Sequence, residues 1–244
     1  MPGRPRGDAG PASPDLGIVG GMGPAATTNF LRQLDELVVA ERDQDHLAYV
    51  VWGDPRVPDR SEALLGRGPS PLPHLRSAVV QLAGLGVRLI AMPCNTAHHW
   101  IGELSAISEV PIVDMVAETA RRTALAHPGA RVCVLATTGT SCSPMYRDRL
   151  TAAGLELVAL DDPSVRLVEA AIRAVKANDL HGARSQLEAI IEPVERLHVD
   201  AAIVACTDLS HLVGQTGVDV GLPTIDASES LARSCLGYFG RRIA

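Results

Sequence analysis

The chain has 244 residues, a length that suits one large domain or two small ones with a sizeable core. Hydrophobic residues make up 46% of it and charged residues 20%, so a folded globular protein is expected. The net charge of -6 provides no positive field for nucleic acid or an anionic membrane, so an anionic ligand would need local positive groups.

Residues 1–15 contain Pro, Gly and charged residues without an apolar run, and are expected to form a disordered tail rather than a signal peptide. No apolar stretch approaches the roughly 20 residues that a membrane span needs. Five cysteines without the spacing of a disulfide framework fit reduced thiols. We therefore expect a soluble cytoplasmic protein that binds neither nucleic acid nor membranes.

Short β-branched apolar runs alternate along the chain with longer segments of helical period. Strands are predicted at 16–20, 47–52, 88–92, 131–136, 156–160 and 200–205, with shorter candidates at 111–114 and 223–226. Helices are predicted at 24–40, 72–84, 98–107, 115–126, 144–153, 164–176, 180–197 and 227–239. Residues 53–71, rich in Gly, Pro and Arg, are expected to form a long loop. This alternation predicts an α/β protein with mainly parallel sheet.

The sequence contains an internal duplication. A shift of 112 residues places Cys94 on Cys206 and Asp114 on Asp226, so that VPIVDMVAETAR overlays LPTIDASESLAR. A shift of 116 residues places IVGGMG (18–23) on VLATTG (134–139). Two copies of one α/β unit are the simplest explanation; the alternative is a chance match between two α/β segments.

Cys94 and Cys206 each follow a predicted strand. Ligands of open parallel sheets bind beyond the carboxyl ends of the strands, so two facing halves would bring both thiols to one cleft. A thiolate and a thiol on opposite faces of a carbon could remove a proton and return one, which inverts the carbon. Helix N-terminal amides and nearby hydrogen bonds are candidate sources of thiolate stabilisation. The alternative is a small buried residue, which suits Cys133 and Cys235 better.

Three cofactors are alternatives to the thiol pair: zinc, a dinucleotide and pyridoxal phosphate. A zinc site of Cys94, His98, His99 and Cys206 would lack any accompanying CxxC or HxxxH spacing. Gly21, Gly23 and Ala26 satisfy the GxGxxA spacing of a dinucleotide turn, but Asp54 comes about ten residues too late for the expected acid. An anion-binding helix N-terminus explains these glycines equally well. A pyridoxal phosphate Schiff base would require Lys176, the single lysine of the chain.

The motifs GGMGPAAT, PDRS, PCNTAHHW, LATTGTSCSPMY, VKAND and ACTDLS together resemble the aspartate/glutamate racemase superfamily, and within it the cofactor-independent aspartate racemases. The resemblance runs from about residue 16 over nearly the whole chain. It implies two pseudo-symmetric three-layer α/β halves, each with a mainly parallel four-stranded sheet, and an active site in the cleft between them. The first half would comprise 16–113 and 227–244, and the second 114–226. A homodimer without any cofactor is implied as well.

The resemblance also implies the roles of individual residues. Cys94 and Cys206 would be the catalytic acid/base pair. The residues that would bind an acidic amino acid or related dicarboxylate are Met22, Gly23, Arg60, Asn95, Thr96, Thr138, Thr140, Lys176 and Thr207. Arg60 and Lys176 would hold carboxylates, by a planar guanidinium and a compact point charge respectively.

One motif departs from the family pattern, because the usual CTE, apolar residue, proline is replaced here by CTDLS. Asp208 and Ser210 therefore make the substrate less certain than the reaction. The sequence predicts a racemase of aspartate first and glutamate second. The alternatives are a relative with maleate isomerase, decarboxylase or hydantoin racemase chemistry, and a non-catalytic sensor of an acidic metabolite.

Overall fold

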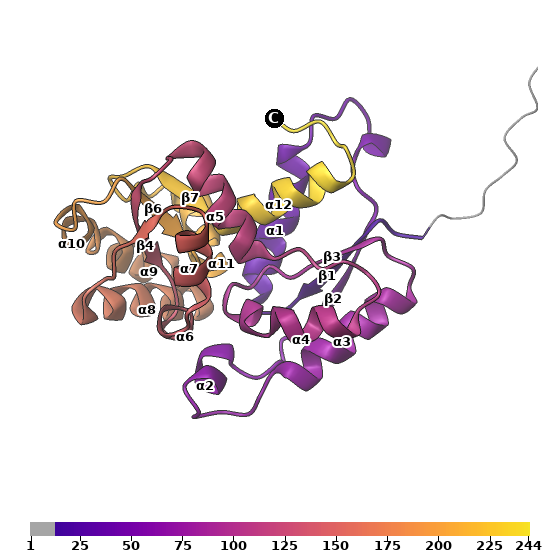
Figure 1. Ribbon diagram of the computed structural model, residues 1–244, viewed down its shortest axis with the longest axis horizontal. Helices are drawn as coiled ribbons and strands as arrows, with labels where there is room; N and C mark the ends of the chain where they lie inside the picture. Colours follow the sequence, from indigo (N-terminus) through magenta and orange to yellow (C-terminus); the bar gives the residue numbers. More distant parts are fainter. Residues whose placement is uncertain (1–12) are drawn as a thin grey trace, which may run out of the picture.

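A computed structural model describes residues 13–244 of the chain (Figure 1). The first half is built on a three-stranded parallel sheet in the order β2–β1–β3. Its strands are β1 (Leu16–Gly20), β2 (Tyr49–Gly53) and β3 (Leu89–Ala91). All five residues of β1 are buried, because the central strand of a parallel sheet is covered on both faces.

The expected fourth strand of this sheet, at 111–114, is wrong. Its pairing is limited to a single parallel bridge between Ile90 and Ile112. The N–H of Ile90 donates to the carbonyl of Pro111 and the N–H of Val113 donates to the carbonyl of Ile90, both at 2.9 Å, and the pairing extends no further. The first sheet therefore has three strands rather than four.

The second half is built on a four-stranded parallel sheet in the order β5–β4–β6–β7. Its strands are β4 (Arg131–Leu135), β5 (Glu156–Leu157), β6 (Ala201–Val204) and β7 (Thr224–Asp226). The predicted strand at 156–160 is shortened to two residues. The two separate parallel sheets confirm the α/β class with two sheet-based halves.

Helices cover both sheets. Those of the first half are α1 (Pro24–Leu37), α2 (Arg60–Leu64), α3 (Leu72–Gly84) and α4 (Ile101–Ile107), with short 3-10 turns η1 (Asp43–Asp45) and η2 (Thr96–Trp100). The later helices are α5 (Met115–Ala126), α6 (Thr138–Cys142), α7 (Met145–Ala152), α8 (Asp162–Lys176), α9 (Leu180–Glu188), α10 (Ile191–Glu195), α11 (Thr207–Thr216) and α12 (Ala227–Tyr238). The predicted helix 180–197 is divided into α9 and α10. The sequence prediction omitted α2, α6 and α11.

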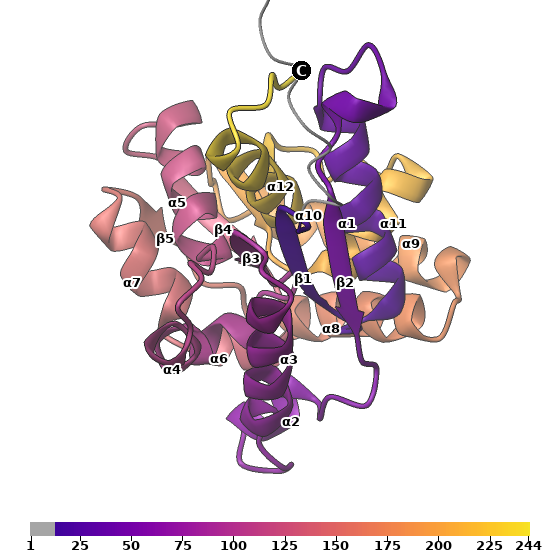
Figure 2. The same ribbon diagram turned by 90° about the vertical axis from the view of Figure 1, so that its right-hand side faces the viewer.

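The last helix, α12, lies beside α1 in Figures 1 and 2. Its Leu231 and Cys235 share a hydrophobic cluster with Leu16 of β1 and Phe30 of α1. Met115 at the start of α5 joins the same cluster. The chain therefore returns to the first sheet after completing the second, and α5 and α12 together join the two halves.

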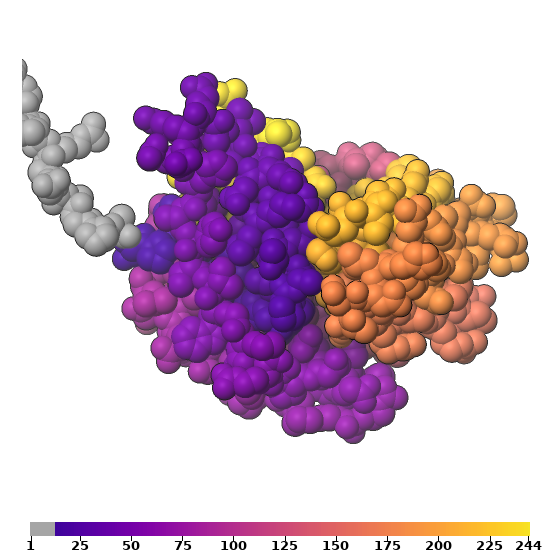
Figure 3. Space-filling view, turned by 180° about the vertical axis from the view of Figure 1, so that it is seen from behind, coloured from indigo at the N-terminus to yellow at the C-terminus, as the bar shows by residue number. Residues whose placement is uncertain are grey.

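Figure 3 shows the two halves packed against each other along a continuous seam. Most of the expected tail, residues 1–12, lies outside the described residues. Asp15 is ordered, because its N–H donates to the carbonyl of Ala48 at 2.8 Å and its side chain lies 3.1 Å from Arg88. Over residues 13–244, no helix is both long enough and apolar enough to cross a membrane.

Candidate active site

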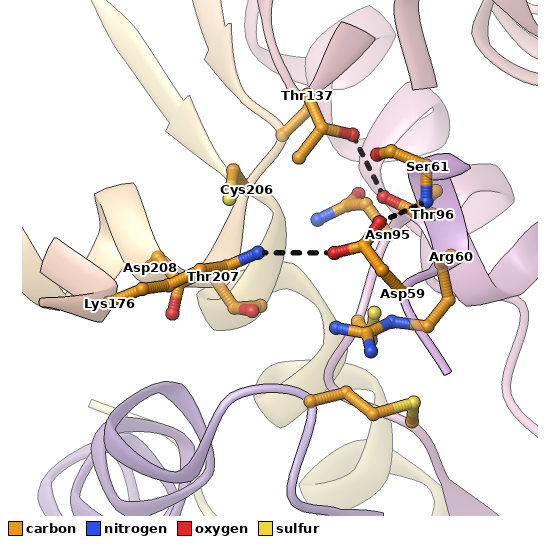
Figure 4. A pocket seen from close by; sticks show the side chains of 13 residues that line it. Asp59, Arg60, Ser61, Asn95, Thr96, Thr137, Lys176, Cys206, Thr207 and Asp208 are labelled. Carbon is orange, nitrogen blue, oxygen red and sulfur yellow. Dashed lines mark hydrogen bonds and ion pairs between the residues drawn. The ribbon is translucent and has the colours of Figure 1, made fainter. Parts of the chain in front are cut away.

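Four strands of the two sheets end at one pocket. The segments that follow β1, β3, β4 and β6 contribute Met22, Cys94, Thr137 and Cys206 to its lining. Such convergence is expected where the carboxyl ends of parallel strands face each other. Figure 4 shows this pocket and the side chains that line it. Its remaining lining residues are Asp59, Arg60, Ser61, Asn95, Thr96, Lys176, Ala205, Thr207 and Asp208.

The two cysteines of the duplicated motif lie on this pocket, each with only 6% of its surface exposed. A hydrogen bond joins their chain segments, since the Thr207 hydroxyl donates to the carbonyl of Pro93 at 3.1 Å. Each residue of this bond is the direct neighbour of one cysteine. The structure thus brings Cys94 and Cys206 together in the arrangement that the strand-end argument predicts.

Cys206 is held as a neutral thiol. Burial raises the pKa of Cys206, and the charge of Asp208 raises it further, while the N–H groups of Leu209 and Asp208 lower it by less. The N–H groups at the start of α11 act in the direction that the sequence suggested, but burial and the charge of Asp208 outweigh them.

One cation reaches the pocket from each half. Arg60 opens α2 and donates through Nη1 to the carbonyls of Val57 and Pro58, at 3.2 and 3.1 Å. Its Nε is buried and has no protein partner within the described part of the chain. Lys176 ends α8, and its Nζ lies 3.8 Å from the Asp59 carboxylate (Figure 4).

Asp59 connects the two halves at the pocket. Its side chain accepts from the N–H groups of Ser61 and Glu62 and so caps α2. Burial alone would raise the pKa of Asp59, but the bond from Glu62 N–H and the charges of Lys176 and Arg60 outweigh it and lower the pKa. Asp59 is therefore ionised at neutral pH and fixes Lys176 at the pocket.

Asp208 is the second carboxylate of the pocket and is only 4% exposed. Burial raises the pKa of Asp208, and the charges of Lys176, Arg60 and His211 act in the opposite direction. The lining therefore combines two thiols, two cations, two carboxylates and several hydroxyl and amide groups. A zwitterion with an extra carboxylate would find a partner here for each of its charges.

Three predicted binding residues lie behind or beside the pocket lining. The Thr140 hydroxyl is 2.9 Å from that of Thr96, which does line the pocket. The N–H of Thr138 donates to Glu169, and this residue borders a neighbouring cavity. Gly23 borders an adjoining opening that also reaches Arg60.

Five lining residues were absent from the sequence-based selection: Asp59, Ser61, Thr137, Ala205 and Asp208. All of them are direct neighbours of a selected residue. Asp208 was visible as a departure from the family motif, but its burial against the cations depends on the packing of the two halves. Gly139 shows how close that packing is, because an added Cβ would lie 2.6 Å from the Cα of Ser61.

The local geometry fits neither the zinc site nor the dinucleotide turn considered from the sequence. The ring nitrogens of His98 lie 2.9 and 3.3 Å from the carbonyl oxygens of Cys94 and Val113, so this imidazole is already used. From residue 13 onward, no three His, Cys, Asp or Glu side chains form a metal-binding group. Gly21 has φ +91°, and an added Cβ would meet the backbone of Asp54 at 2.5 Å, so packing explains this glycine without a nucleotide.

Known proteins resemble this chain over nearly its whole length. The sequence profile of the Asp/Glu/Hydantoin racemase family matches residues 19–235. The broad specificity amino-acid racemase of Bacillus subtilis is 29% identical over 236 residues, covering 92% of this chain and 97% of that protein. The structure of Picrophilus torridus aspartate racemase has a TM-score of 0.83 and 34% identity, covering 94% of this chain and 96% of its own. Glutamate racemase from Campylobacter jejuni shares the fold, with a TM-score of 0.65 and 18% identity over 94% of this chain and 87% of its own.

Proposed function

Because the chain belongs to the Asp/Glu/Hydantoin racemase family, whose named relatives are isomerases, we propose that it racemises an acidic amino acid without a cofactor. The family inferred from the sequence motifs is thereby confirmed, while the substrate and the thiol mechanism are proposals. The observation that supports them most strongly is the placement of Cys94 and Cys206 on one pocket beside Arg60 and Lys176.

The proposed reaction moves one proton off and one proton onto the α-carbon. The Cys94 thiolate removes the α-proton from one face, and the electron pair of the broken C–H bond passes into the carboxylate as an enediolate. The Cys206 thiol then donates its proton to the opposite face of the carbon. Cys94 ends as a thiol and Cys206 as a thiolate, and the reverse direction uses them in exchanged roles.

The raised pKa of Cys206 supports this assignment of roles in the free enzyme. A group that starts a turnover as a proton donor must be protonated at the working pH, and burial together with Asp208 keeps Cys206 so.

The cations supply charge for an acidic substrate. One carboxylate becomes more negative as the α-proton leaves, so a preorganised cation near it lowers the barrier. The buried Asp208 is a suitable partner for the substrate ammonium, since it faces the pocket beside Cys206. Arg60 and Lys176 together provide one positive group for each carboxylate of a dicarboxylic amino acid.

Aspartate is the first candidate substrate. The Picrophilus torridus relative with 34% identity is an aspartate racemase, and it matches this chain over almost its full length. The Bacillus subtilis relative is named for broad specificity, so the test requires a panel of amino acids.

The test measures inversion of the α-carbon and its labelling with deuterium. Single enantiomers of aspartate, glutamate and alanine are incubated with the enzyme in deuterated water, and circular dichroism and mass spectrometry follow inversion and label. We expect aspartate to invert and to gain one deuterium at the α-carbon. Inversion without label, or a covalent substrate adduct on either cysteine, would refute the two-thiol scheme.

A further inference from the structure

The side-chain amide of Asn95 is buried, and only its oxygen forms a hydrogen bond within residues 13–244. The residue follows Cys94 directly, lines the pocket and is only 3% exposed. Its Nδ2 has no hydrogen-bond partner among residues 13–244. An unpaired buried donor costs on the order of 1–3 kcal/mol, so such a group is retained where a ligand can satisfy it.

The other end of the amide is firmly held. The hydroxyl of Tyr146 donates to Asn95 Oδ1 at 2.6 Å. Tyr146 lies on α7 of the second half and is 2% exposed, although it is not part of the pocket lining. Burial raises the pKa of Tyr146, so the phenol stays a donor at every working pH.

This contact determines which way the amide faces. Figure 4 shows the amide nitrogen of Asn95 directed into the pocket on the side of Cys206. A flipped amide would turn Oδ1 toward the anionic carboxylate of a substrate, which is repulsive. It would also break the hydrogen bond that the Tyr146 hydroxyl donates to Oδ1.

We propose that Tyr146 is a positioning residue for racemisation, whose hydroxyl fixes the Asn95 amide with its NH₂ toward the substrate carboxylate. This inference rests on the proposed function and adds a residue from the second half to the machinery around Cys94. The amide then donates to an oxygen whose negative charge grows as the α-proton leaves. The donor is aimed before the reaction begins and needs no reorganisation during it.

The loss of the Tyr146 hydroxyl should reduce the rate more than the apparent affinity. Removal of a whole preorganised donor costs on the order of 10²- to 10³-fold in kcat. An amide that is merely released still samples the correct orientation, so we expect Tyr146→Phe to lower kcat about 10-fold and to raise KM by less, about 2- to 3-fold. Tyr238→Phe is the matched control, because Tyr238 is 53% exposed on α12.

A double-mutant cycle separates positioning from a general structural effect. The variants Tyr146→Phe, Asn95→Ala and their combination are compared by kcat for aspartate and by their thermal unfolding midpoints. If the hydroxyl acts through the amide, Tyr146→Phe changes kcat by less than about 2-fold once Asn95 is alanine. Equal losses in both backgrounds, or a single Tyr146→Phe variant with unchanged kcat, would overturn the proposal.

The same cycle has a readout that does not need turnover. Succinate, an inert dicarboxylate, is titrated calorimetrically into the wild type and the three variants. Tyr146→Phe should weaken succinate binding in the wild-type background and not in the Asn95→Ala background. A wild type that binds succinate with this pattern but inverts no amino acid would refute the proposed function and leave the positioning intact. Equal succinate affinities throughout, or no succinate binding by the wild type, would refute the positioning.

Discussion

Both cysteines follow a parallel strand and precede a helical segment, η2 or α11, but their chemical surroundings differ. Cys94 is followed by Asn95, which presents an unpaired amide donor to the pocket, whereas the second residue after Cys206 is Asp208, a buried carboxylate. The Asp208 carboxylate raises the pKa of the Cys206 thiol. Both sulfurs thus lie at strand ends on one pocket, while the side chains beside them differ.

The two halves also differ at the side chains that contact the backbone carbonyl of each cysteine. In the first half the imidazole of His98 lies between the carbonyls of Cys94 and Val113. At the equivalent position of the second half, the Ser210 hydroxyl lies 3.3 Å from the carbonyl of Cys206 and 2.7 Å from the Asp226 carboxylate. His98 thus links Cys94 to Val113, the residue before the N-cap of α5, whereas Ser210 links Cys206 to Asp226, the N-cap of α12.

The largest expected effect is the loss of either sulfur. Cys94→Ser and Cys206→Ser should each reduce racemisation of aspartate about 10³-fold, because a serine hydroxyl is a far poorer acid and base near neutral pH. The measurement is kcat by circular dichroism. Cys142→Ser, on the exposed end of α6, is the control and should keep full activity. If either pocket variant kept more than a tenth of the wild-type activity, the reaction would not require both cysteines.

The contributions of the two cations come next. Lys176→Ala should lower kcat/KM for aspartate roughly 10- to 100-fold, since hydrogen bonds to charged groups are worth about 1.5–3 kcal/mol. Arg60→Ala removes the corresponding group of the first half and should act similarly. Arg173→Ala lies one turn earlier on α8, outside the pocket lining, and should leave kcat/KM unchanged. An unaltered kcat/KM in Lys176→Ala would show that Lys176, the cation from the second half, does not bind a substrate carboxylate.

A third prediction concerns the effect of Asp208 on the pKa of Cys206. The negative charge of Asp208 raises the pKa of Cys206, so Asp208→Asn should lower that pKa. Activity that needs a Cys206 thiol falls as pH rises through its pKa, so the alkaline limb of kcat should move to lower pH. Asp148→Asn, an exposed change on α7, provides the control. A stationary alkaline limb would show that burial alone sets the state of Cys206.

The smallest effects are expected at the two helix caps. Asp114 has a lowered pKa, because the N–H of Ala117 and the side chain of Arg149 outweigh its burial, whereas burial raises the pKa of Asp226. Ionised Asp114 therefore adds stability above its unfolded pKa, which is lost as pH falls through the folded value. Asp226 has the opposite sign, so its ionisation reduces stability as pH rises.

Substitution by asparagine should therefore give different results in the two halves. At pH 7, Asp114→Asn should lower the free energy of unfolding by about 1 kcal/mol, a value that allows for solvent screening at the partly exposed Arg149. Asp226→Asn keeps a cap acceptor without the buried charge and should be neutral or slightly stabilising. Urea unfolding at pH 7 and pH 4 measures both. Equal destabilisation at the two caps would contradict the assigned signs.

The sequence predicted the site best where local patterning determines structure. Apolar runs predicted β3 and β6, and a residue that follows such a strand must lie at the carboxyl end of the sheet, which placed Cys94 and Cys206. The expectation of a four-stranded first sheet failed although the equivalent segment of the second half, with Pro223 and Asp226 at matching positions, forms β7, so the local pattern does not decide whether a ladder forms.

Features that depend on tertiary packing were not predictable in this way. Helix α11 contains Gly, Ser, Thr and Asp, all weak helix formers, and forms because Leu209 and Leu212 are buried in the core of the second half. The five residues of α2 are too few to show a helical period. The Tyr146 contact with Asn95 joins residues 51 positions apart across the two halves, which no local pattern reveals.

The central claim is that two thiols serve opposite faces of one carbon, and α-hydrogen exchange in deuterated water tests it most directly. Cys94→Ala and Cys206→Ala are each incubated with L-aspartate and with D-aspartate, and proton NMR follows the α-hydrogen. We predict that each variant exchanges the α-hydrogen of one enantiomer only, and that the two variants select opposite enantiomers. Exchange of both enantiomers by either variant, or the same preference in both, would contradict the account.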